Sequence, residues 1–136
     1  MDLSFESRYA RVSFDEGSNA IITVWKEQVT NDAYKRTFLE ILNAIKKYGA
    51  TSLISDISVQ GKVPITSRLW MQENILPEAI NYGIMQIATV VSQTDYERYS
   101  YDGNTQHILI GNRQVEFKYF RETDEAFQWA ALQELV

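Results

Sequence analysis

The segment TNDAYKRTFLEILNAIKKYGATSLISD, residues 30–56, decides the fold because it joins a long amphipathic helix to a short strand. In its first part, apolar residues recur with the 3.6-residue period of a helix and form one stripe. The stripe consists of Tyr34, Phe38, Ile41, Leu42, Ile45 and Tyr48. Thr30 is a suitable N-cap and Gly49 follows the last turn, so both ends of this helix are marked.

The residues on either side of this helix predict strands. Residues 52–57 form a short apolar run, and residues 9–14 and 20–25 alternate as two strands of a β-hairpin with a loop at 15–19. Strands that are joined through a helix run parallel with a right-handed crossover, whereas the hairpin adds an antiparallel edge. The sheet is therefore expected to be mixed.

Residues 66–82 show a second helical pattern, which contains Pro77. Proline removes a backbone donor and clashes with the preceding turn. Either this helix is kinked, or a new helix starts near Asn74 with Pro77 in its first turn. The apolar residues 85–91 then predict a central strand that is covered on both faces.

The last third of the chain is less regular. Residues 95–112 contain three tyrosines and a turn signal at 102–104, and residues 105–110 fit either a short helix or a strand. Residues 115–120 predict a strand, and Thr123 is expected to cap the last helix. Together these elements predict an α/β fold: one domain, residues 1–136, with a mixed sheet of about five strands flanked by helices and an N-terminal β-hairpin.

The composition narrows the classes of function. Of 136 residues, 45% are hydrophobic and 23% charged, and the formal net charge of -5 disfavours nucleic acid as a partner. The absence of cysteine excludes disulfides and thiolate chemistry, and no apolar run is long enough to span a membrane. Because the acidic start lacks the apolar core of a secretory signal, a cytoplasmic location is expected.

Several short strings of the sequence resemble the STAS-like proteins, and in particular the bacterial group similar to the anti-sigma-factor antagonist of sporulation. The matching strings lie at residues 53–58, 76–79, 87–91, 117–120 and 124–129, and Trp70 lies on the helix after the first of them. This resemblance implies a small cytoplasmic STAS-like domain without catalysis, which binds a protein partner or a small ligand.

The resemblance also implies a regulatory site. In the antagonist branch a serine at the start of the helix after the Asp-Leu-Ser strand end is phosphorylated, and here Asp56-Ile57-Ser58 is similar to that strand end. The Asp-Ser-Ser-Gly motif of the family is missing, so the acceptor would be Thr66 or Ser67. The structural alternative is that this Thr-Ser pair caps the helix.

Other candidate residues follow from the predicted topology. Asp56 is expected at the carboxyl end of a parallel strand, where open α/β sheets bind ligands, unless it only accepts hydrogen bonds from the loop at 59–64. Tyr96 and Tyr99, with Tyr101, could contact a ligand or a partner, or serve packing alone. His107 has no nucleophile or orienting carboxylate beside it in the sequence, so no catalytic residue, metal site or cofactor is predicted.

These observations favour a non-enzymatic regulatory or binding module that acts through protein–protein interaction. Its surface is expected to comprise Asp56, Ser58, Thr66, Ser67, Tyr96 and Tyr99. The alternative is a carrier or sensor of a small apolar or acidic ligand, since similar folds occur in lipid-transfer domains, and an enzyme ranks third. The hairpin leaves an edge strand without proline, which could pair with a second copy and form a homodimer.

Overall fold

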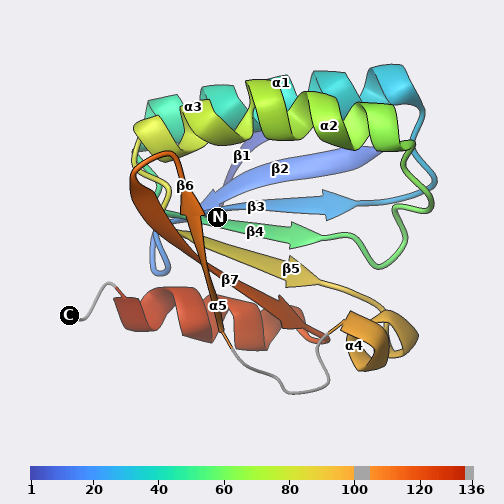
Figure 1. Ribbon diagram of the computed structural model, residues 1–136. Helices are drawn as coiled ribbons and strands as arrows, with labels where there is room; N and C mark the ends of the chain where they lie inside the picture. The colour runs from blue at the N-terminus through green and yellow to red at the C-terminus, as the bar shows by residue number, and fades with distance from the viewer. Residues whose placement is uncertain (100–104, 134–136) are drawn as a thin grey trace.

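The computed structural model describes residues 1–99 and 105–133, which form one seven-stranded sheet with helices on both faces (Figure 1). The strand order across the sheet is β1-β2-β3-β4-β5-β7-β6. The strands are β1 (Asp2–Glu6), β2 (Ala10–Asp15), β3 (Ala20–Trp25), β4 (Ser52–Asp56), β5 (Gln86–Val90), β6 (Gln106–Ile110) and β7 (Arg113–Phe120). The predicted α/β class, the mixed sheet and the N-terminal hairpin of β2 and β3 are confirmed.

The centre of the sheet is parallel and both sides are antiparallel. β3, β4, β5 and β7 run parallel, with Ile22 in register with Ile54, and Ile54 with Ala88. β1 pairs antiparallel with β2, and β6 pairs antiparallel with β7. One helix joins β3 to β4, and two helices join β4 to β5, as expected for parallel neighbours that are connected through helices.

The predicted number of about five strands is wrong, because β1 and β6 add an edge strand on each side. β1 has two acidic ends and a β-bulge between Leu3 and Phe5, so its sequence lacks regular alternation. The predicted hairpin strand is therefore covered by β1 and does not form the edge. Of the two alternatives for residues 105–110, the strand is confirmed as β6.

The long helix α1 (Asn31–Tyr48) has the predicted ends. The Thr30 hydroxyl accepts the N–H of Ala33 at 3.1 Å, and Gly49 adopts φ 68° while its N–H bonds the carbonyl of Ile45. Gly49 is suited to this left-handed cap because it lacks Cβ. Lys46 and Lys47 lie in the last turn, where cations interact favourably with the helix dipole.

The second helical pattern is divided into α2 (Ile65–Asn74) and α3 (Leu76–Asn81). Pro77 lies in the first turn of α3, so the alternative of a new helix near Asn74 is confirmed and a single kinked helix is not observed. α1, α2 and α3 lie together over one face of the sheet (Figure 1). Their apolar residues pack against the strands in a core that includes Ile21, Ile41, Ile45 and Ile84.

The opposite face of the sheet is covered unevenly. Helix α5 (Thr123–Gln133) packs over β4, β5 and β7, where Ala126 and Ala130 are buried against Ile54, Ala88 and Phe120. The short α4 (Gln93–Tyr99) lies near the carboxyl end of β7 (Figure 1). Within the described residues, no helix packs over this face of β1 and β2.

Candidate functional site

Asp56 and Ser58, two residues of the predicted site, form a tight turn at the carboxyl end of β4. The Asp56 Oδ1 accepts the Ser58 N–H at 3.1 Å and the Ser58 hydroxyl at 2.6 Å. Ser58 is exposed, and Asp56 is half-buried. The predicted structural role of Asp56 is thus present in part, with Ser58 as the donor in place of the loop at 59–64.

The two candidate phosphoacceptors lie in the first turn of α2 and differ in exposure. Thr66 is exposed, whereas Ser67 is 1% exposed and its hydroxyl donates a hydrogen bond to Oδ1 of Asn31. The predicted capping role of this pair is wrong, because Pro64 occupies the N-cap and no side chain caps the helix. Pro64 has φ -57° and ψ 145°, so the chain is extended at this residue and becomes helical from Ile65 onward.

The loop between β4 and α2 is held by the segment after β3. Gln28 Nε2 donates to the carbonyl of Lys62 at 2.9 Å, and the N–H of Val29 donates to the carbonyl of Gln60 at 3.2 Å. Val63 packs against the cluster that contains the buried Trp25. This loop is therefore part of the packed structure.

Tyr96 lies on α4, at the same carboxyl edge of the sheet as Asp56, and the Arg121 guanidinium lies 5.4 Å from the centre of its ring. The side chain of Tyr99 and all of Tyr101 lie outside the described residues. No interaction in the described part of the chain joins Tyr96 to Asp56, Ser58, Thr66 or Ser67. The described side chains of the predicted site share one edge of the sheet, but they do not form one cluster.

His107 lies on the edge strand β6 and is exposed. In the register of the sheet it is opposite Glu116 of β7. Among residues 1–99 and 105–133, no group of three or more His, Cys, Asp or Glu side chains could hold a metal ion.

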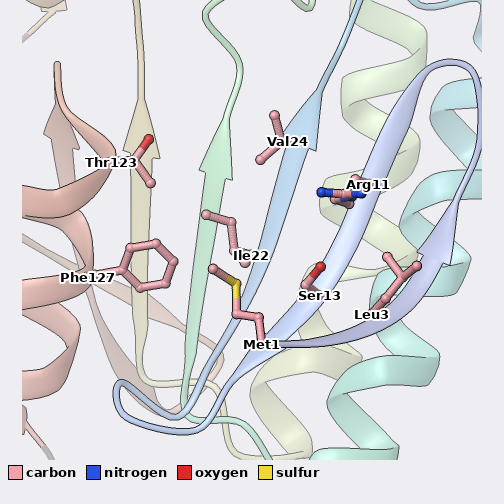
Figure 2. A pocket seen from close by; sticks show the side chains of 8 residues that line it. All are labelled: Met1, Leu3, Arg11, Ser13, Ile22, Val24, Thr123 and Phe127. Carbon is pink, nitrogen blue, oxygen red and sulfur yellow. The ribbon is translucent and has the colours of Figure 1, made fainter.

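A groove on the half-open face of the sheet is the strongest candidate site, and sequence analysis did not predict it. Figure 2 shows its lining, which comes from Met1, β1, β2, β3 and the start of α5. The groove has a volume of about 390 Å³. Its lining residues are Met1, Leu3, Arg11, Ser13, Ile22, Val24, Thr123 and Phe127.

The floor and walls of this groove are mostly apolar. Ile22 is almost fully buried in the floor, whereas Leu3 on the edge strand is 55% exposed. Phe127 of α5 forms the opposite wall and also packs against the core beneath the helix. Small-molecule sites are concave, mostly apolar and about 300–1,000 Å³ in volume, so the groove falls within the range of a binding site.

Arg11 is the one charged residue among the described residues that line this groove, and Glu6 and Lys26 lie beside it. The Arg11 Nε lies 3.2 Å from Oε2 of Glu6, and the Lys26 Nζ lies 2.8 Å from the same oxygen. Hydrogen bonds from Lys26 and Arg11 lower the pKa of Glu6, so this carboxylate is ionised at neutral pH. Two cations therefore share one anion, and Figure 2 shows the Arg11 guanidinium on the groove side of β2.

The sequence held only a weak signal for this groove. Arg11 and Ser13 occupy alternate positions of β2, while β3 is apolar on both faces with Ile22 and Val24 on the α5 side. A strand that is apolar on both faces beside a strand that is polar on one face indicates where the cover by helices ends. Leu3 was missed because β1 was not predicted.

Fold and groove together define an α/β protein with a mixed sheet, on which α1, α2 and α3 lie over one face and α5 covers only part of the other. Comparison with models of protein families, with curated proteins and with solved structures gave no match. The resemblance to STAS-like proteins therefore stays a prediction. No helix within the described ranges has both the length and the apolar character needed to span a membrane.

Proposed function

We propose that this protein is a non-enzymatic binding module and that it binds its partner on the open face of β1, β2 and β3. The observation that carries this proposal is the apolar groove beside α5, in which Leu3 is 55% exposed on the edge strand. Exposed apolar patches with polar rims are typical of binding surfaces in folded proteins. The groove is formed by neighbouring strands of one sheet and by the start of α5, so its lining residues already lie together in the free protein.

In a second form of this proposal, phosphorylation at the start of α2 regulates the binding module. The exposed Thr66 favours it, because a kinase can reach this side chain in the folded protein. Ser67 requires opening of the contact with Asn31 before it can be modified. Incubation with a cognate kinase followed by intact-mass analysis tests this form, with a phosphate on wild type and none on Thr66→Ala as the expected result.

Site-specific photocrosslinking in living cells tests the binding surface. A photoreactive phenylalanine analogue is introduced at Leu3, on the open face, and separately at Leu39, which is 48% exposed on α1. We expect a discrete adduct from position 3 and none from position 39, and intact-mass analysis then separates a small ligand, a second copy and another protein. Adducts from position 39 alone would contradict the proposed surface.

A further inference from the structure

The groove on the open sheet face has two chemically different parts. Its body is formed by aliphatic and aromatic side chains of β1, β3 and α5, and one side carries the Arg11 guanidinium. The Ser13 hydroxyl lies between these parts (Figure 2). This division is typical of a site for a molecule that has an apolar chain and a polar head.

The charge of the polar part favours an anion. The Lys26 ammonium donates to both Glu6 and the carbonyl of Ser7, at 2.8 and 2.7 Å. Arg11 directs its Nε and one Nη toward Glu6, and its side chain is 56% exposed. A guanidinium has five N–H donors, so Arg11 retains donors for a carboxylate or a similar anion.

The same charge disfavours other occupants. An uncharged apolar surface that covered Arg11 would remove water from the guanidinium N–H groups that do not bond Glu6 and would leave them without an acceptor, which is costly. A cationic amphiphile would be repelled by the Arg11 and Lys26 pair. An anionic head at Arg11 with its chain along Ile22, Val24 and Phe127 satisfies both parts of the groove.

We infer that the groove binds a free amphiphilic anion, a medium-length alkyl carboxylate, with the head at Arg11 and the chain between β3 and α5. This inference rests on the proposed function, since it names the ligand of the same open face. The chain of the ligand covers the exposed apolar groove, and its carboxylate balances the excess positive charge beside Glu6.

The test compares three probes with the same alkyl chain: decanoate and decyltrimethylammonium below their critical micelle concentrations, and 1-decanol below its solubility limit in water. Binding to the full chain is followed by two-dimensional ¹H–¹⁵N NMR titration. We expect decanoate to shift amide signals of β1, β2, β3 and the start of α5, with an affinity about fivefold above that of decanol. The cationic probe is expected to bind most weakly.

Charge and apolar variants locate the site. Arg11→Gln is expected to weaken decanoate binding about fivefold and to leave decanol binding unchanged. Arg8→Gln is the matched control, since Arg8 is 74% exposed and pairs with Glu27 outside the groove. Leu3→Ser is expected to weaken both probes, whereas Leu39→Ser on α1 affects neither. Circular dichroism confirms that each variant folds.

Three results would overturn the inference: equal affinity for decanoate and decanol, equal effects of Arg11→Gln and Arg8→Gln, or signal shifts outside the groove. Binding to vesicles of anionic phospholipid without binding of monomeric decanoate would also overturn it, in favour of a lipid surface. If decanoate fails while crosslinking at position 3 captures a protein, the open face remains the binding surface and only the ligand class is wrong.

Discussion

Tyr34 is the side chain whose ionisation is most affected by folding among those described. It stacks on Trp25 with ring centres 5.8 Å apart and is 3% exposed. Burial raises the pKa of Tyr34 to about 12, and the positive charge of Arg68 partly opposes this effect. The folded protein thus holds Tyr34 neutral at a pH where the unfolded chain ionises it.

This difference predicts a pH-dependent contribution to stability. A raised pKa in the folded state stabilises the fold fully below about pH 10, and the contribution is lost as the pH rises toward 12. We expect wild type to lose about 1 kcal/mol from this group between pH 10 and 11, and Tyr34→Phe to avoid that loss. Urea unfolding at pH 10 and at pH 11 measures this loss.

The control for this prediction is Tyr82→Phe, which removes the hydroxyl of a tyrosine that is 51% exposed. As the pH rises from 10 to 11, wild type should lose more free energy of unfolding than Tyr34→Phe does. An equal pH-dependent difference for both variants would show that burial of Tyr34 is not its cause.

Gly61 shows how one residue holds the loop between β4 and α2. Its φ is 78°, and the side chain of Gln28 occupies the position where a Cβ would lie. Gly49 also has a positive φ, but nothing lies within 4 Å of its Cβ position. Alanine substitutions at Gly49 and Gly61 therefore separate two free-energy costs. Both substitutions carry the cost of the left-handed backbone conformation, and only Gly61→Ala carries the cost of displacing Gln28.

We expect Gly49→Ala to lower the free energy of unfolding by about 1 kcal/mol, the cost of a left-handed non-glycine residue. Gly61→Ala is expected to cost about 1 kcal/mol more, because Gln28 must turn away and loses its hydrogen bond to Lys62. In a double-mutant cycle, Gly61→Ala and Gln28→Ala together should lower the free energy of unfolding by less than the sum of the two single substitutions. Additive costs would contradict the contact.

At the scale of elements, the starts of α1 and α2 use different signals. Thr30 caps α1 through its hydroxyl, whereas Thr66 lies inside α2 after the Pro64 N-cap. We expect Thr30→Ala to lower the free energy of unfolding by about 1 kcal/mol and Thr66→Ala by less than about 0.5 kcal/mol. Chemical unfolding of both variants measures this, and equal losses would contradict the assignment of the two caps.

The elements that the sequence predicted are those with local signals. The periodic stripe of α1, its two caps and Pro77 at the start of α3 depend on neighbouring residues alone. The missed strand β1 and the undecided strand β6 are both edges, where pairing on one side and partial exposure weaken the alternation of apolar residues. The cap of α2 was missed because Pro64 provides a backbone constraint in place of a hydroxyl.

The candidate site was less predictable than the fold, because it depends on where helices lie over the sheet. The carboxyl ends of parallel strands were expected to hold it, yet the loop after Asp56 is packed against the segment after β3. The groove instead joins Leu3, Arg11 and Phe127, which are brought together only by the edge pairing of β1 and the position of α5. No local pattern encodes that arrangement.

At the scale of the whole molecule, the uneven cover of the sheet predicts uneven stability. Ile54 of β4 and Ala88 of β5 are 0% exposed with helices over both faces, whereas β1 pairs on one side and has one open face. Local opening costs more free energy where more apolar surface is buried. We expect native-state hydrogen exchange to be slowest in β3, β4 and β5, with opening free energies at least about 2 kcal/mol above those of β1 and β6.

Addition of decanoate extends this prediction to the open face. A ligand that binds only the folded groove raises the opening free energy of the strands that form it. Protection should therefore increase in β1 and β2, with little change in β6, which lies at the opposite edge of the sheet. Exchange of β1 as slow as that of β4 in the free protein would show that the open face is stable without a ligand. This result would contradict the prediction that the missing helix cover lowers the stability of β1.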